Sequence, residues 1–190
     1  MSTFFTSDHH FGHHKMLRYQ AHTRPYPNVG VMDEHLIELW NELVADNDIV
    51  HHLGDLCLGT MVDALRYLSQ LKGRIKFTPG NHDYWVGGYE KSGTTILSAS
   101  GHPVEIMPLY HTVKIGDQRV MLCHYPMRSW HASYYGSWHL YGHMHTTGAP
   151  WGMSLNVGVD LNEGRPFKEE DITMKMQENM KHFHKAARGV

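Results

Sequence analysis

Apolar residues in the first half of the chain fall into three short β-prone runs, and each run stops at a glycine or at a polar cluster. Runs of this length that are bounded by turn-forming residues are typical of strands that end in loops. The three predicted strands cover residues 3–7, 49–53 and 74–78.

Two amphipathic helices are predicted between these strands. Residues 33–45 carry apolar side chains at helical spacing, and Asp33 is the expected N-cap. Residues 60–73 begin with Thr60 and Asp63, which have the spacing of a capping box. The order strand, helix, strand, helix, strand favours βαβ units with parallel pairing and therefore an α/β fold.

The second half of the chain has a different pattern, with shorter strands and longer polar segments. A hairpin is expected at 109–123 and a further strand at 155–159, so the sheet structure should be of mixed direction. Residues 84–101 and 127–139 have the composition of loops, and 168–190 that of a terminal helix. No internal repeat or linker is present, so we expect one domain over the whole chain.

Composition limits the class of protein. With 190 residues and 41% hydrophobic side chains, the chain is globular and long enough for one substantial core. No apolar run approaches a membrane span of about 20 residues, and the N-terminus lacks the basic start of a secretory signal. We therefore expect a cytoplasmic protein with no membrane partner. The composition does not predict an oligomeric state.

Charge and histidine content change this picture further. Lys and Arg number 17 against 19 Asp and Glu, a formal net charge of −2, which disfavours broad binding to nucleic acid or anionic lipid. The two cysteines, Cys57 and Cys123, are expected to be reduced, buried thiols rather than metal ligands. Histidine is the outlier, with 18 residues, and neutral imidazole is a common transition-metal ligand.

Metal-binding side chains follow the predicted strands at the points where those strands end. In α/β sheets the carboxyl ends of the strands form the ligand-binding edge, so side chains far apart in sequence should meet there. A loop with two histidines one residue apart follows later, and an extended backbone lets both point into one site. The candidate ligands are Asp8, His10, Asp55, Asn81, His124, His143 and His145.

This mixed oxygen and nitrogen set contains no thiolate and suits Mn, Fe, Zn or Ni. Seven ligands exceed what one tetrahedral ion uses, whereas two ions sharing a bridging carboxylate need about this number. Ions roughly 3.5–4 Å apart can activate water and clamp both oxygens of an in-line phosphoryl displacement. The ligand set therefore predicts a binuclear centre and phosphoryl chemistry.

The same residues resemble, in order, the five motifs of calcineurin-like metallophosphoesterases. The segments 6–13 and 156–160 are similar to the small bacterial and phage branch of that superfamily. The resemblance covers most of the chain and implies a four-layer αββα sandwich with two mixed β-sheets. The motifs are Asp8-x-His10, Gly54-Asp55, Gly80-Asn81-His82-Asp83, His124 and Gly142-His143-x-His145.

The resemblance also implies roles for these residues. A hydroxide held between two metal ions, with manganese favoured over iron, nickel or zinc, would attack phosphorus. His82 would stabilise or protonate the leaving oxygen, and Asp83 is a candidate to orient His82. One ion would be held by Asp8, His10, Asp55 and His145, and the other by Asp55, Asn81, His124 and His143.

Several functions remain open on the sequence alone. The favoured one is a phosphodiesterase acting on a small or nucleotide phosphate ester. A phosphomonoesterase or protein phosphatase is disfavoured because such relatives place an arginine shortly after the Gly-Asp motif, where this chain has Leu56-Cys57-Leu58-Gly59. A nuclease, with nucleic acid as substrate only, is a variant of the first function. A non-catalytic scaffold is least favoured because Asn81-His82 are intact.

Two secondary features complete these expectations. The aromatic loop from Trp130 to Trp138 either stacks a nucleobase or covers the sheet. His13 lies close enough to the first motif to be a candidate substrate contact, whereas His51 and His52 are expected to pack or hydrogen-bond inside a strand.

Overall fold

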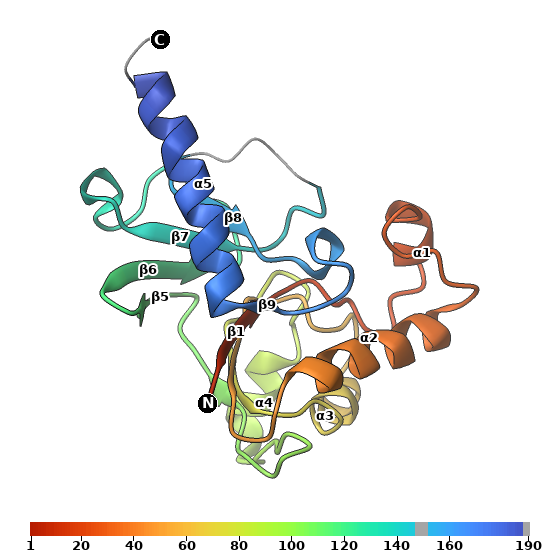
Figure 1. The fold of residues 1–190 in the computed structure, drawn as a ribbon. Helices are drawn as coiled ribbons and strands as arrows, with labels where there is room; N and C mark the ends of the chain where they lie inside the picture. Colours follow the sequence, from red (N-terminus) through yellow and green to blue (C-terminus); the bar gives the residue numbers. More distant parts are fainter. Residues whose placement is uncertain (147–151, 188–190) are drawn as a thin grey trace.

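Two β-sheets lie at the centre of the computed structural model, which describes residues 1–146 and 152–187, with side chains described up to residue 180 (Figure 1). The first sheet has the order β4-β3-β2-β1-β9, with β9 antiparallel to its neighbour and the other pairs parallel. Its strands are β1 (Thr3–Thr6), β2 (Ile49–His52), β3 (Arg74–Phe77), β4 (Glu105–Ile106) and β9 (Phe167–Lys168).

The second sheet has the order β5-β6-β7-β8. Its first two strands form the predicted antiparallel hairpin, and the remaining pairs are parallel. Its strands are β5 (Tyr110–Ile115), β6 (Gln118–Cys123), β7 (Trp138–Tyr141) and β8 (Ser154–Asn156). Both sheets are therefore mixed, and the predicted α/β class with two mixed sheets is confirmed.

Helices flank the two sheets. α2, α3 and α4 pack on one face of the first sheet, and α5 packs against β1, β8 and β9 (Figure 1). No helix among the described residues is long and apolar enough to cross a bilayer. The helices are α1 (Met16–Tyr19), α2 (Val29–Leu43), α3 (Met61–Leu68), α4 (Val86–Ser92) and α5 (Glu169–Ala187), with 3₁₀ turns at Ser133–Tyr135 and Val159–Leu161.

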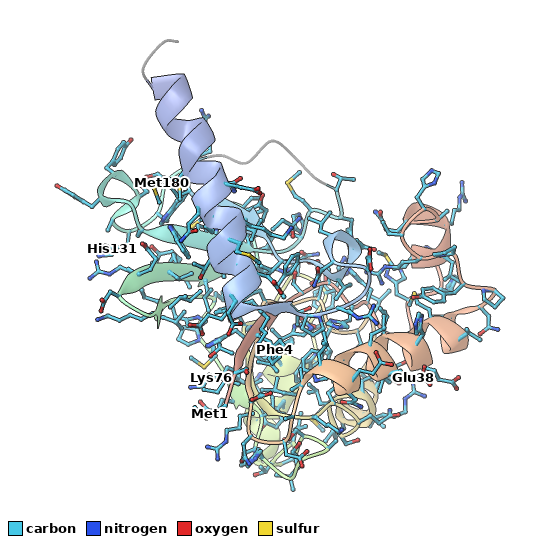
Figure 2. The ribbon with its side chains drawn as sticks, viewed as in Figure 1. Met1, Phe4, Glu38, Lys76, His131 and Met180 are labelled. Atoms are coloured by element: carbon cyan, nitrogen blue, oxygen red, sulfur yellow. The ribbon has the colours of Figure 1, made fainter. Side chains whose placement is uncertain are left out.

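Neighbouring residues of β1 serve two different cores, because successive strand side chains point to opposite faces. Phe4, labelled in Figure 2, packs with Trp40 of α2 on the helix side of the sheet. Phe5 packs with Leu122 and Leu140 of the second sheet. The first sheet is therefore buried on both faces, which fixes the positions of its carboxyl ends.

The start of α2 differs from the prediction. Asp33 is not its N-cap, because Asn28 occupies that position and its side-chain oxygen accepts the Val31 N–H at 3.0 Å. Asp33 lies buried in the second turn, where its carboxylate accepts the Gly12 N–H and the Tyr67 hydroxyl. The sequence predicts a cap where the structure has a cross-link between two helices and the loop after β1.

Two predicted loops contain regular structure. The segment 84–101 includes α4, and 127–139 includes a 3₁₀ turn and the start of β7. Gly87 and Gly88 lower the helix propensity of the first segment, so the pattern does not reveal the helix. The predicted terminal helix is α5 as far as Ala187, and residues 188–190 lie outside the described part.

Candidate metal centre

The candidate ligands lie on loops that follow parallel strands, as the sequence predicts. Asp8 follows β1, Asp55 follows β2 and His124 follows β6. The loop after β7 carries His143 and His145, and the loop after β3 carries Asn81 and His82.

All seven predicted ligands and His82 come together. Within each of three groups, the possible ligand atoms lie within 4.8 Å of one another. The Asn81 amide oxygen joins the third group, 3.0 Å from Nε2 of His124. The groups are Asp8 with His10 and His145, His10 with Asp55 and His82, and Asp55 with His124 and His143.

Asp55 lies between the other ligands. Its Oδ2 is 3.5 Å from Nε2 of His10 and 3.5 Å from Nε2 of His124, while Oδ1 accepts the backbone N–H of His82 at 2.9 Å. Burial alone would raise the pKa of Asp55, but the contact with His124 and the backbone hydrogen bond hold it at about 2. Asp55 is therefore a carboxylate with one oxygen available to both sides of the cluster.

Two of the candidate histidine ligands also have a hydrogen-bond partner at ring nitrogen Nδ1, and this contact sets the orientation of the ring. His124 Nδ1 donates to the Leu53 carbonyl oxygen at 2.7 Å, which turns Nε2 toward Asp55 and the cluster. His145 Nδ1 lies 2.8 Å from Oδ2 of Asp160. Histidine ligands of metals usually carry such a partner on the other ring nitrogen, which sets their tautomer and orientation.

His10 has a buried nitrogen that is unpartnered among the described residues. Its Nε2 is shielded from solvent without a hydrogen bond, although it points toward Asp55. Burial lowers the pKa of His10 to about 2, so the ring is neutral at neutral pH. A buried lone pair beside a carboxylate is costly unless a cation or donor meets it, so these donors fit a divalent ion.

The backbone at the cluster is strained. Six non-glycine residues in the described ranges have positive φ, and four of them are candidate ligands: Asp8 at 62°, His10 at 51°, Asp55 at 56° and His143 at 68°. This left-handed region is unfavourable for residues with a Cβ atom, and such strain collects at functional sites. Hydrogen bonds from Asp8 N–H to the Gly54 carbonyl and from His10 N–H to the Asp55 carbonyl hold the two loops together.

Glycine permits the close approach of the loops. A Cβ on Gly80 would lie 2.7 Å from the Asp55 nitrogen and 2.9 Å from Cε1 of His124, too near for either contact. The loop after β3 therefore needs glycine at this position in order to bring Asn81 and His82 to the cluster.

The expected contact between Asp83 and the ring of His82 is not found in the described part of the chain. Its Oδ2 accepts the N–H groups of Asp55 and Gly80 at 2.7 and 2.8 Å, and its Oδ1 accepts those of Leu56 and the Trp85 indole. Asp83 therefore fixes the backbone that carries Asp55, and it reaches His82 only through that loop.

Sequence reasoning missed a buried ion pair behind the cluster. Arg24 donates two hydrogen bonds to the Asp160 carboxylate at 2.8 Å each, and further ones to the carbonyl oxygens of Asp8 and His9. Asp160 also accepts from His145, so the pair joins two ligand-bearing loops. Residues 156–160 carry a family resemblance, but nothing in the local sequence indicates this partner.

The expectations for the cysteines, the aromatic loop and His13 have different outcomes. Cys57 and Cys123 are free and buried, and burial raises the pKa of the Cys57 thiol to about 12, so neither supplies a thiolate. The base-stacking interpretation of the aromatic loop is wrong for Trp130 and Trp138, which are only 8% and 4% exposed and pack against the sheet. The ring of His13 lies 5.4 Å from that of His10, at the edge of the cluster.

The fold and the site together define a layered α/β protein whose histidine and aspartate groups could hold metal ions. No family model matches the chain. The chain is 30% identical over 187 residues to the uncharacterized protein MJ1445 of Methanocaldococcus jannaschii, covering 94% of this chain and 92% of that protein. It therefore belongs to the same family as MJ1445.

Two solved structures resemble the fold. The protein of unknown function AQ665 from Aquifex aeolicus has a TM-score of 0.69 and 20% identity, with 91% of this chain and 98% of that chain covered. YfcE, a phosphoesterase from E. coli, has a TM-score of 0.45 and 18% identity, with 83% and 78% covered. The first of these likenesses supports the fold assignment.

Proposed function

We propose that this protein is a metal-dependent phosphoesterase that uses two divalent ions and acts on phosphodiesters. The observation that carries the proposal is the position of Asp55. One carboxylate oxygen lies 3.5 Å from imidazole nitrogens of two separate ligand groups, which is the arrangement that a carboxylate shared by two ions requires.

The residues divide into two ligand sets. Bound ions would supply Lewis acidity and a nucleophile at neutral pH. Asp55 serves both sets, and burial lowers the pKa of His10, so that imidazole brings no repelling charge to the cations. Asp8, His10 and His145 complete the first set, and Asn81, His124 and His143 the second. Manganese is the favoured metal, with iron, nickel and zinc as alternatives, because the donors are oxygen and nitrogen only.

His82 is placed to handle a proton at the leaving oxygen. Its backbone is held by Asp55, while its side chain is 35% exposed at the edge of the cluster, with Nε2 4.0 Å from Oδ2 of Asp55. A partly exposed imidazole beside the ligands can reach a substrate and donate a proton without serving as a buried ligand.

The preference for diesters rests on the two residues directly after Asp55. Leu56 and Cys57 are fully buried, so this stretch offers no guanidinium to a terminal phosphate. A monoester carries an additional charge that such a group would neutralise, whereas a diester replaces that charge with a second ester group. Phosphomonoesterase or protein phosphatase activity is therefore the second candidate.

The test uses chelator-treated protein reconstituted with Mn, Ni, Zn or Mg. We expect about two ions per chain, metal-dependent hydrolysis, and a higher kcat/KM for bis-p-nitrophenyl phosphate than for p-nitrophenyl phosphate. Cyclic nucleotides and single-stranded DNA in the same panel test the small-molecule and nuclease variants. Metal content near zero with Mn, or bound metal without hydrolysis, overturns the proposal. A clear monoester preference overturns the diesterase part.

A further inference from the structure

Two tyrosines stand beside the candidate ligands and have no role in the function proposed above. Tyr125 directly follows His124 and is 44% exposed, and Tyr84 directly follows Asp83 and is 79% exposed. Both belong to loops that carry candidate ligands, after β6 and β3. Large aromatic rings therefore face solvent at the edge of the cluster.

The ring of Tyr125 is held against two candidate ligands. Its centroid lies 5.0 Å from that of His124 and 5.1 Å from that of His143, with interplanar angles of 77° and 62°. These edge-to-face contacts fix the ring in place and leave part of its surface to solvent. Tyr125 is a rigid aromatic surface on the side of the cluster that Asp55 shares with these two histidines.

Tyr84 lies in the same neighbourhood. The Asn81 amide oxygen, on the same loop as Tyr84, lies 3.0 Å from Nε2 of His124, the residue directly before Tyr125, so the loops that carry the two tyrosines meet here. Neither phenol can carry a positive charge. They can stack or donate a hydrogen bond, but they cannot neutralise a phosphate.

Two further exposed tyrosines belong to a different part of the molecule. Tyr134 and Tyr135 are almost fully exposed on the 3₁₀ turn, two and three residues after Ala132, in the loop that carries His131 at the outer edge of the second sheet (Figure 2). They match Tyr84 in chemistry and exposure but follow no candidate ligand, so they provide matched controls.

We propose that Tyr84 and Tyr125 form a subsite that stacks a flat aromatic ester group of the substrate, such as an aryl ring or a nucleobase, beside His124 and His143. The inference rests on the proposed phosphoesterase function and deepens it, because it names the substrate class as phosphodiesters with an aromatic group. Stacking on rigid tyrosines discriminates by the shape of the ester group, since the phosphate is the same in every diester.

The experiment compares two diesters with the same leaving group. Bis-p-nitrophenyl phosphate and methyl p-nitrophenyl phosphate both release p-nitrophenolate and differ only in whether the retained ester is aryl or methyl. We expect wild-type protein to prefer the aryl ester in kcat/KM. Tyr125→Ala should reduce that preference about 10-fold, mainly through KM, and Tyr84→Ala should reduce it in the same direction. Tyr125→Phe should retain the preference because the ring remains.

A control variant and measurements of metal content distinguish the loss of stacking from damage to the metal centre. Tyr134→Ala should leave the aryl preference at the wild-type value. Metal content measured on each variant shows whether Tyr125→Ala disturbs His124 or His143, and the ratio of the two substrates cancels any general loss of rate. An aryl preference that is absent from the wild type, or unchanged in both alanine variants, overturns the subsite and leaves the phosphoesterase intact.

If the protein hydrolyses neither diester, the proposed phosphoesterase function is overturned but the subsite is not. In that case a measurement of ligand binding tests the subsite. Calorimetry on manganese-treated protein would compare adenosine 5′-monophosphate with ribose 5-phosphate. The subsite predicts tighter binding of the nucleotide, lost in Tyr125→Ala and kept in Tyr134→Ala. Equal affinities for the two ligands in the wild type would overturn the inference.

Discussion

At the scale of single residues, Asp55 is the side chain on which both ligand groups depend. Replacing it by asparagine keeps the shape but removes the negative charge, which leaves two cations facing each other without compensation. We expect Asp55→Asn to lower metal content from about two ions to less than one and to abolish hydrolysis. Metal analysis after reconstitution measures this, with Asp117→Asn in the exposed hairpin turn as the control. Two retained ions and full activity would rule out the shared carboxylate.

Replacing His82 should have a different effect from replacing a metal ligand. We expect His82→Ala and His82→Asn to lower kcat by about 10²–10⁴ while metal content stays close to the wild type, because a positioned acid is lost and the buried ligands remain. The loss should shrink for substrates with good leaving groups such as p-nitrophenolate, which scarcely need a proton. Equal losses across leaving groups of widely different pKa would instead assign His82 to positioning phosphate.

Asp160 should act on the metal through His145. Asp160→Asn keeps the size of the side chain but loses the negative charge that His145 Nδ1 and Arg24 both face at 2.8 Å. Such partners of histidine ligands are worth about 10–100-fold in metal affinity. Competition titration with a metal indicator should show that loss for one of the two ions. Thr23→Ala, which removes only one outer hydrogen bond to Asp160, should have a smaller effect. Unchanged affinities in a folded Asp160→Asn protein would refute the role.

The candidate metal ligands can be predicted from the sequence, but the residues that hold those ligands in place cannot. Asp8, Asp55 and His124 each follow a predicted strand, so local pattern and the geometry of parallel sheets indicated where they meet. Arg24 and Asp160 are 136 positions apart. Their pairing exists only once the chain has folded, and each residue alone has the sequence signature of a surface charge.

At the scale of elements, the strength of the local signal decided what the sequence could predict. β1, β2 and β3 are apolar runs with clear ends, and their parallel pairing followed from the helices between them. α4 was missed because its glycines weaken the helical pattern. The short strand β9, of two residues, is defined by pairing with β1 rather than by periodicity. Elements that depend on tertiary partners leave little trace in the local sequence.

Asp33 shows how an element is fixed by a partner distant in sequence. Its carboxylate joins α2 to the Gly12 N–H and the Tyr67 hydroxyl. Asp33→Ala leaves the buried Tyr67 hydroxyl without this acceptor, at about 1–3 kcal/mol for an unsatisfied group, whereas loss of the cap in Asn28→Ala should cost about 1 kcal/mol. Urea unfolding of metal-free protein measures both, with Glu34→Ala on the exposed face of α2 as the control. An Asp33→Ala protein as stable as that control would contradict the cross-link.

At the scale of the whole molecule, the histidine excess has two explanations. The candidate metal centre accounts for five of the 18 histidines, and these gather at one edge. Others are packed inside the fold: His51 stacks on Phe5, and His52 shares a 2.9 Å hydrogen bond with His9. Burial lowers the pKa of His51 and of His52 to about 3, so both are neutral in the folded protein. The composition therefore reflects neutral packing as well as the candidate metal centre.

These buried neutral histidines should make the metal-free protein sensitive to acid. The unfolded chain binds protons below its ordinary histidine pKa of about 6.5, while folded His51 and His52 remain neutral until the pH approaches 3. The unfolded state therefore holds more protons in this window, and the free energy of unfolding should fall as pH decreases from about 6.5 toward 3. Each such histidine contributes a slope of about 1.4 kcal/mol per pH unit.

Denaturant unfolding of metal-free protein at pH 7.5, 6.5, 5.5 and 4.5 measures the slope. His51→Phe keeps a flat ring against Phe5 but removes one titrating group, so its stability curve should be flatter than that of the wild type by about 1.4 kcal/mol per pH unit below pH 6. The effect should persist at high salt, because its origin is the burial of a neutral ring rather than a screened surface charge. His22→Phe, at an exposed position, should leave the slope unchanged. Parallel curves for wild type and His51→Phe would show that His51 takes up its proton without unfolding.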